Sequence, residues 1–188
     1  MTIVALIQIL QKLAKSHKKR VFFLREMAEL SGSSHAAAAM TLLRAAKKGL
    51  VGRTGNLWIN LMDPPDLLEV AFHLVSPSYV SFETALYHHG ILSQAPRGSL
   101  TMATSTRSRV AKTPLGTIQY IHLKPSLFFG FDKKRVAFPE KAWLDVLYTR
   151  GLRGRKNILT EEFYLEDLDV KKIKKWGRLF PLWVKSMA

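Results

Sequence analysis

The 188-residue sequence predicts an α+β fold divided into two domains. Apolar residues that recur at three- and four-residue spacing indicate helices, and short alternating apolar runs between them indicate strands. Asp63-Pro64-Pro65 interrupts this pattern and is the best candidate for a linker, since prolines favour breaks between elements. Hydrophobic residues make up 47% of the chain, which is enough for packed cores.

The first 30 residues predict two supporting helices. From Thr2 to Lys15, the apolar residues form one stripe along a helix. A basic connector from His17 to Arg20 follows, and a second helix runs from about Phe23 to Leu30. Gly32 suits the tight turn after it, because glycine adopts positive φ at little cost.

A third helix and a hairpin complete the predicted N-terminal domain. The helix runs from about Ser34 to Lys48, with Ser33 or Ser34 as its N-cap, and Gly49 ends it. Leu50-Val51 and Leu57 to Ile59 form the strands of a hairpin that bends at residues 54–56. This order of elements is that of a winged helix-turn-helix. We therefore predict such a DNA-binding domain over residues 1–62.

The third helix is expected to turn one face inward and the opposite face to DNA. Its predicted inner stripe consists of Ala36, Ala39 or Met40, Leu43 and Ala46. Small residues on the outer face would let the helix enter a major groove, with the basic residues near its end at phosphates. The predicted DNA-binding residues are Ser33, Ser34, His35, Thr41, Arg44, Lys47, Lys48, Arg53 and Thr54.

Structural interpretations of the same residues, which need no DNA contact, remain open. An alanine run also follows from helix propensity alone, and a Lys-Lys pair at a helix end is favoured by the helix dipole. Trp58 alternates within an apolar strand, so we expect it in the core and not on a stacking surface. The combination of helix and basic hairpin, and no single residue, carries the prediction.

Residues 66–188 predict a mixed α/β domain with a small, largely antiparallel sheet. Helices are expected over 66–75, 82–89, 139–148 and 170–180, with Ser81 and Asp169 as caps. Strands are expected over 100–103, 116–123, 127–131 and 135–138, with a polar loop over 104–112. Thr160-Glu161-Glu162 has the composition of a helix start.

The charge favours a polyanionic partner. The chain has 29 Lys and Arg against 14 Asp and Glu, a net charge of +15. Residues 1–62 carry +8, residues 63–140 carry +2 and residues 141–188 carry +5. Neutralisation of phosphates with release of counterions rewards such a surface, so nucleic acid is the first interpretation. A basic protein without a polyanion partner is the alternative.

Other function classes lack support in the sequence. There is no cysteine, and neither a phosphate-binding glycine loop nor a nucleophile elbow is present. The adjacent His88 and His89 point apart on a helix, and Glu140 and Asp145 are poorly spaced for paired acid–base catalysis. No apolar run is long enough to span a membrane. We expect a cytoplasmic protein that is not an enzyme and uses no cofactor or metal.

Two segments of the second domain match the pattern of a known family. Tyr79 to Leu92 reads YVSFETALYHHGIL, and Arg135 to Tyr148 reads RVAFPEKAWLDVLY. The matching residues are Ser81, Glu83, Ala85, Leu86, His89 and Gly90, followed by Pro139, Glu140, Lys141, Ala142, Leu144, Asp145, Leu147 and Tyr148. With the basic N-terminal domain in front, the chain resembles the AbiEi-family antitoxins of bacterial abortive-infection toxin–antitoxin systems. Trp143 departs from the family pattern, in which a smaller aliphatic residue is common.

The resemblance implies two linked roles. The N-terminal domain would repress its own operon by binding inverted repeats of double-stranded DNA in the promoter, as a monomer that pairs on DNA. The second domain would counter a toxin of nucleotidyltransferase fold, in a type IV system that does not require direct contact between the two proteins. Candidate surface residues of the antitoxin domain are Arg107, Arg109, Arg153, Arg155 and Lys156.

Two other hypotheses stay open. The basic C-terminal third could make the chain a general nucleic-acid-binding or RNA-directed module. The winged helix could instead bind a protein partner, without any antitoxin activity. For the matched polar residues of the second domain, a local ion-pair network competes with a functional role.

Overall fold

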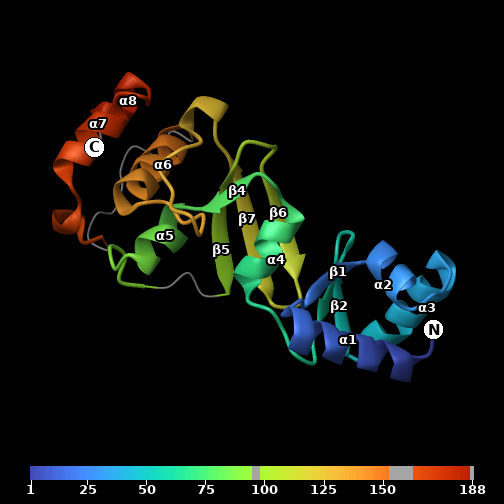
Figure 1. The fold of residues 1–188 in the computed structure, drawn as a ribbon. Helices are drawn as coiled ribbons and strands as arrows, with labels where there is room; N and C mark the ends of the chain where they lie inside the picture. The colour runs from blue at the N-terminus through green and yellow to red at the C-terminus, as the bar shows by residue number, and fades with distance from the viewer. Residues whose placement is uncertain (95–97, 153–162, 187–188) are drawn as a thin grey trace. The chain divides into compact units, whose positions relative to one another are not determined.

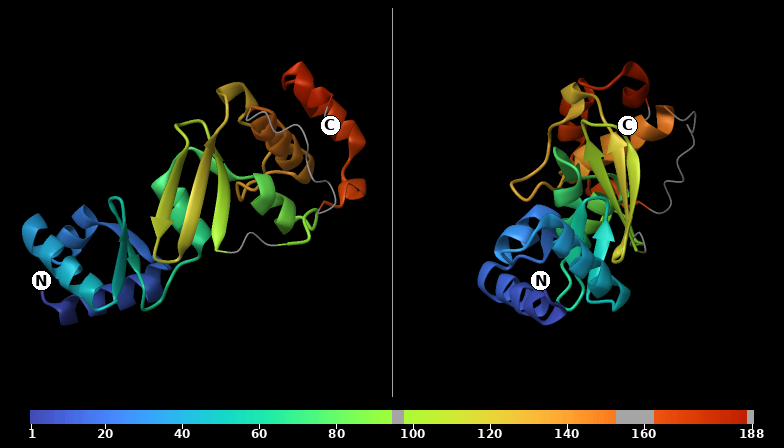
Figure 2. Two further views of the ribbon diagram at one scale, coloured as in Figure 1. Left: turned by 180° about the vertical axis from the view of Figure 1, so that it is seen from behind. Right: turned by 90° about the vertical axis from the view of Figure 1, so that its right-hand side faces the viewer.

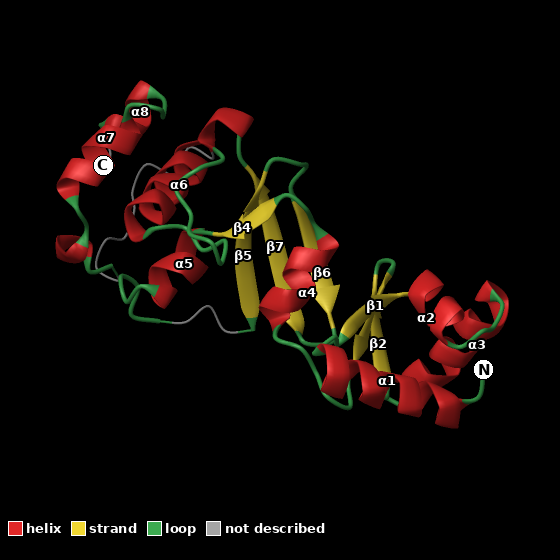
Figure 3. Cartoon of the chain, in the orientation of Figure 1, coloured by secondary structure: helices red, strands yellow, loops and turns green. Residues whose placement is uncertain are grey.

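The computed structural model describes residues 1–94, 98–152 and 163–186, and it has the α+β class that the sequence predicts (Figures 1 and 3). Contacts divide the chain into two compact units. The first unit comprises Met1–Val75 with Ala111–Gly116, and the second comprises Ser76–Val110 with Thr117–Ala188. Among the described residues, no helix is long and apolar enough to cross a membrane.

The first unit contains helices around a three-stranded antiparallel sheet, in the strand order β1-β3-β2. Its elements are α1 (Ile3–His17), β1 (Val21–Phe23), α2 (Leu24–Leu30), α3 (His35–Lys47), β2 (Val51–Thr54), β3 (Leu57–Asn60) and α4 (Leu67–Leu74). The expected helices and hairpin are confirmed, with small shifts at their ends. Strand β1 was not predicted. It occupies the chain between the basic connector and α2, and it pairs along β3.

The core of the first unit joins all of its early elements. Leu6 and Leu10 of α1 contact a cluster that includes Phe22 of β1, Leu42 of α3 and Trp58 of β3. Trp58 is only 3% exposed, so its predicted place in the core is confirmed. The sheet and the third helix are therefore held together by one continuous apolar cluster.

The sequence-based domain boundary differs from the observed division. The prediction ends the first domain at residue 62 and assigns the following helix to the second. In the structure, α4 packs against β1 and β3, and the division falls after Val75. Val70 and Ala71 are buried on this helix, which explains its membership of the first unit.

A four-stranded sheet with the order β4-β5-β7-β6 belongs to the second unit, except for residues 111–116 at the end of β6 and the start of β7, which belong to the first. Its strands are β4 (Ser78–Val80), β5 (Ser99–Thr104), β6 (Arg109–Thr113) and β7 (Gly116–His122). Strand β4 runs antiparallel to β5, but β5 and β7 are parallel from Ser99↔Thr117 to Thr104↔His122. The sheet is therefore mixed, and the expectation of a largely antiparallel sheet is wrong for this central pair.

Several smaller expectations for the second unit also need correction. Part of the expected polar loop over 104–112 is strand β6. The expected strands over 127–131 and 135–138 are replaced by a short 3-10 helix, η1 (Pro125–Leu127), and by isolated bridges of Val136 with Val80 and of Ala137 with Phe131. The segment from Thr160 to Glu162 lies outside the described residues.

The helices of the second unit form successive layers beside the sheet (Figure 2). These are α5 (Phe82–His88), α6 (Pro139–Leu152), the 3-10 helix η3 (Leu165–Asp167), α7 (Val170–Gly177) and α8 (Leu182–Lys185). Helix α5 packs on β5, and α6 packs against α5 on one side and against α7 and α8 on the other. As a result, every residue from Glu140 to Tyr148 is buried. A helix that is covered on all sides must satisfy its polar side chains within the protein.

The matched polar residues of the second unit form a buried network. Lys141 pairs with Asp145 one helical turn later, and its Nζ donates to Tyr79 Oη at 2.8 Å. Tyr79 Oη and Ser81 Oγ donate to Asp145 Oδ2 at 3.0 and 2.7 Å. All four residues are fully buried. The expectation of a local ion-pair network is thus confirmed for Lys141 and Asp145, and Ser81 uses its hydroxyl here and not as a helix cap.

Burial shifts the pKa values of the ionisable groups in this network. It raises the pKa of the Asp145 carboxyl and lowers the pKa of the Lys141 amine, while the attraction between the two groups opposes both shifts. Burial also raises the pKa of the Tyr79 hydroxyl, with the neighbouring Asp145 adding to the effect. The network therefore keeps a donating tyrosine and a paired lysine inside an apolar shell.

Aromatic rings and a glycine complete that shell. Lys141 Nζ lies 5.0 Å from the ring centre of Phe129 and 5.4 Å from those of Tyr79 and Phe180, at cation–π distances. Gly130 has a φ of +74°, and a Cβ placed on it would lie 2.9 Å from Lys141 Cγ. Glycine at this position therefore leaves room for the lysine side chain.

Loss of one partner of the buried pair should destabilise the second unit. We expect Lys141→Met to lower the free energy of unfolding by about 3–5 kcal/mol, because Asp145 would keep an uncompensated buried charge. Lys141→Met with Asp145→Leu should recover part of the loss. Urea denaturation followed by circular dichroism measures each value.

Arg25→Met provides the matched control, because Arg25 and Glu29 have the same spacing on α2 but are exposed to solvent. It should leave the unfolding midpoint unchanged. Equal effects of Lys141→Met and Arg25→Met would contradict the role assigned to the buried pair.

Candidate functional site

The turn before α3 fixes how this helix begins. Ser34 is the N-cap, and its Oγ accepts a hydrogen bond from the amide of Ala37 at 3.2 Å. The hydroxyl of Ser33 lies 2.7 Å from that of Ser31, which donates to the carbonyl of Met27 at 2.7 Å. The hydroxyls of Ser33 and Ser34, both predicted to contact DNA, thus have local partners that set the direction of the helix.

The solvent-exposed face of α3 differs from the predicted one. Ala38, Thr41, Leu42 and Ala45 are buried, so the predicted inner stripe is wrong for Ala36, Met40 and Leu43. Of its other members, Ala46 packs against the core as predicted, and Ala39 is half-buried. Met40 is 51% exposed and Leu43 is 43% exposed. The outward residues, here called the α3 face, are His35, Ala36, Met40, Leu43, Arg44 and Lys47.

Thr41 is therefore not available to DNA. It is 2% exposed, and its Oγ1 lies 2.7 Å from the carbonyl of Met1 and 3.0 Å from that of Ala37, as a donor to both. The prediction placed it on the outer face because its spacing from Ser34 and Lys48 fits that face. Its hydroxyl instead joins α3 to the start of the chain.

Of the two hairpin residues predicted to contact DNA, Arg53 is exposed and Thr54 is buried. The side chain of Thr54 is not exposed as predicted: it is 7% exposed, and its Oγ1 donates to the carbonyl of Lys112 within the same unit. Arg53 is exposed, its Nε donates to the carbonyl of Gly55 at 3.0 Å, and its guanidinium lies 5.5 Å from the ring of Trp58. These contacts hold Arg53 beside the hairpin turn.

His35, Arg44, Lys47 and Lys48 are exposed as predicted. Arg44, Lys47 and Lys48 place cations at the end of α3, and Arg53 places one on the hairpin that follows. No acidic residue lies between Glu29 and Asp63, so these cations have no carboxylate near them in the sequence. This arrangement can hold an anionic backbone across the exposed face of the helix.

The candidate residues of the second unit are less closely grouped. Arg107 lines an open hollow together with Ser105, Thr106, Ser108 and His122, at the adjoining ends of β5 and β7. Arg109 is exposed, and its guanidinium lies 5.4 Å from the ring of Tyr120. Arg153, Arg155 and Lys156 lie outside the described residues.

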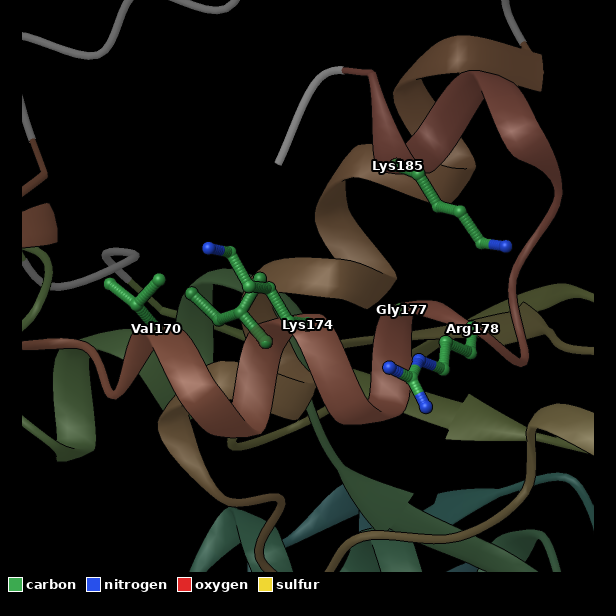
Figure 4. A pocket seen from close by; sticks show the side chains of 6 residues that line it. Val170, Lys174, Gly177, Arg178 and Lys185 are labelled. Carbon is green, nitrogen blue, oxygen red and sulfur yellow. The ribbon is translucent and has the colours of Figure 1, made fainter.

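A second hollow, between α7 and α8, was not predicted (Figure 4). It is lined by residues that include Lys174 and Arg178 of the α7 region and Lys185 of α8. The signal in the sequence is the Lys-Lys-x-Lys-Lys run from Lys171 to Lys175. Among the described residues, no group of three or more His, Asp or Glu could hold a metal ion.

Substitutions can separate the α3 residue that stabilises the fold, Thr41, from a residue of the exposed face, Arg44. We expect Thr41→Val to lower the free energy of unfolding by about 1 kcal/mol, because the carbonyls of Met1 and Ala37 lose their donor. Arg44→Gln, on the exposed face, should leave stability within about 0.5 kcal/mol of the unaltered protein. Urea denaturation distinguishes the two, and an unchanged stability of Thr41→Val would argue against its structural role.

Comparison with known proteins adds no family to these observations. Neither a scan of the chain against protein-family models nor a search of curated protein sequences found a match.

Proposed function

We propose that residues 1–62 form a winged helix-turn-helix and that the protein is a DNA-binding autorepressor and an antitoxin. In this proposal α3 enters the major groove and the β2–β3 hairpin contacts the adjacent backbone. The observation that carries it is the exposed α3 face, which ends in Arg44 and Lys47 on a helix that packs against β2, the strand of Arg53. The net charge of +8 over residues 1–62 supports a polyanion as the partner.

The observed exposed face of α3 changes which groups of the DNA this helix would contact. Ala36 is small enough for close approach, and Met40 and Leu43 present apolar groups where base edges would lie. The apolar feature of the major groove is the C5-methyl group of thymine. We therefore expect the half-site to place thymines opposite Met40 and Leu43, with Arg44, Lys47, Lys48 and Arg53 at phosphates.

The antitoxin role rests on the resemblance of two segments, Tyr79 to Leu92 and Arg135 to Tyr148. The partner would be a toxin of nucleotidyltransferase fold that is countered functionally, with or without direct contact. Two molecules that pair on inverted repeats would supply more specificity than one α3 face. The second candidate function is a module that binds a protein through α3, and the exposed Met40 and Leu43 favour it over a helix face that is wholly polar.

The first test is binding to the chain's own promoter DNA and to a scrambled sequence. We expect the promoter to bind more tightly, and Arg44→Gln with Lys47→Gln and Arg53→Gln to weaken binding. Each lost phosphate contact should flatten the slope of log affinity against log salt by about 0.9. Fluorescence anisotropy over a salt series measures both quantities. Equal affinity for the two sequences would remove the repressor proposal.

The second test replaces thymine by uracil in the promoter fragment, which removes only methyl groups. Each contacted methyl should contribute about 0.8 kcal/mol, or about fourfold in affinity. Met40→Ala with Leu43→Ala should bind both fragments alike. Arg53→Gln is the control, since it should lower affinity but keep the preference for thymine. No difference between the fragments would exclude methyl recognition and leave phosphate binding in place.

The third test separates repression from protection. The product of the neighbouring gene is expressed with the full-length protein or with its Arg44, Lys47 and Arg53 variant, and growth is measured. The variant should still restore growth when it is expressed from an independent promoter. No restoration by the unaltered protein would contradict the antitoxin role, and a stable complex of α3 with a protein partner in the absence of DNA binding would favour the second candidate.

A further inference from the structure

The last two helices form a strongly basic part of the second unit. Between Val170 and Ser186 there are six cations and no carboxylate. The cations are Lys171, Lys172, Lys174, Lys175, Arg178 and Lys185. The nearest acid, Asp169, is the N-cap of α7, and its carboxylate accepts hydrogen bonds from the amides of Lys171 and Lys172. Helices α7 and α8 and the residues between them therefore contribute no carboxylate to this surface.

Four of the cations form a line along one side of α7, here called the α7 stripe. Lys171, Lys174, Lys175 and Arg178 have the spacing i, i+3, i+4 and i+7, which places them on one helical face about 10 Å long. All four are exposed. Lys172 lies off this line, and its Nζ is 3.5 Å from Glu140 Oε1.

The buried side of α7 fixes the direction of the stripe. Ile173 and Gly177 are buried where α7 packs against α6. Glu140, at the start of α6, also accepts a hydrogen bond from the amide of Asp169 at 3.3 Å. These contacts hold the start of α7 on α6, so the α7 stripe must face solvent.

A hollow lies beside the stripe, between α7 and α8 (Figure 4). Its volume is about 450 Å³, and Val170, Ile173 and Gly177 form its apolar wall. Lys174, Arg178 and Lys185 line it from both helices. Among the described residues, none of these three side chains has a hydrogen-bond or ion-pair partner. The volume is within the range of sites that hold small organic groups.

The helix dipole does not account for this arrangement. Cations near the end of a helix are favoured by its dipole, which explains Lys174, Lys175 and Arg178. Lys171 lies in the first turn, where the dipole disfavours a cation. The convergence of Lys185 of α8 on the same hollow also has no explanation in the dipole of α7. An external anion explains both features.

We propose that the α7 stripe and the adjoining hollow bind a single-stranded polynucleotide. Phosphates contact the α7 stripe, and one nucleoside enters the hollow against Val170 and Ile173, with Lys174, Arg178 and Lys185 at the flanking phosphates. A mononucleotide would leave Lys171 and Lys175 without a role. A paired base within a duplex cannot enter a hollow of this kind unless it leaves the stack. Grooves that join cations with a surface for bases are typical of single-strand binding.

The main experiment compares two triple variants of the full-length protein. One replaces Lys174, Arg178 and Lys185 by Gln, and the other replaces Arg44, Lys47 and Arg53 by Gln, so both lose three positive charges. The probes are labelled single-stranded RNA and DNA of about 12 nucleotides, a length within the range of known single-strand sites, and the duplex promoter fragment.

The first triple variant should bind the single strands at least about tenfold more weakly, and its salt slope should flatten by about 0.7 per lost phosphate contact. Its binding of the promoter duplex should not change. The second triple variant should show the reverse pattern. Comparison of the RNA and DNA probes then identifies which strand is preferred.

A substitution in the hollow tests whether binding depends on this place in the protein and not only on its net charge. Val170→Asp places a carboxylate at the first position of α7, where the dipole favours it, so the helix should remain folded. Val4→Asp is the matched control, because Val4 is also an exposed valine in the first turn of a helix. Val170→Asp should weaken single-strand binding more than Val4→Asp does.

Three results would overturn the proposal. The first is equal weakening of single-strand binding by both triple variants, which would mean that net charge alone decides it. The second is equal effects of Val170→Asp and Val4→Asp. The third is no binding of either single strand by the unaltered protein at low salt. None of these results bears on promoter binding by α3, so the two proposals fail independently.

Discussion

The ion pair between Lys141 and Asp145 is the constraint on which the second unit depends. From Glu140 to Tyr148, helix α6 is enclosed by α5, α7 and α8, so the polar side chains of this stretch are shielded from water. Two charges at these positions are tolerated because each faces the other and because Tyr79 and Ser81 complete their hydrogen bonds. Since Tyr79 comes from β4 and Ser81 from the start of α5, the same pair ties the edge of the sheet to two helices. The layers outside α6, including the α7 stripe, are positioned only as long as α6 stays in place.

The sequence predicted where the helices lie along the chain more accurately than which side of each helix is buried. Helix α3 was predicted nearly to the residue from Ser34 and Gly49, because caps and stops are local signals. Its buried face was not, because four successive alanines are equally apolar on every side of a helix. In the structure, contact with the core decides the matter, and Ala38, Leu42 and Ala45 lie inward while Met40 and Leu43 do not. Thr41 was misplaced for the same reason.

Long-range pairing accounts for most of the other differences. Strand β1 has three residues and is defined by its pairing with β3, and the parallel pairing of β5 with β7 joins segments that β6 separates in the chain. Neither the short strand β1 nor the parallel pairing of β5 with β7 has a local signature in the sequence. Helix α6 was predicted from Pro139 onward, but its polar residues do not indicate that all of its sides are buried over residues 140–148. The mutual neutralisation of Lys141 and Asp145 is what allows the polar side to be buried as well.

The exposed apolar pair on α3 has a consequence for the protein in the absence of DNA. Met40 and Leu43 would invite self-association if they stood alone, as exposed apolar neighbours do. Arg44 and Lys47 lie on the same face, so two such faces repel one another when they approach. Charged residues that flank an apolar segment are known to act against aggregation in this way. Salt that screens this repulsion would therefore lower the colloidal stability of the free protein while it loosens the protein from phosphates.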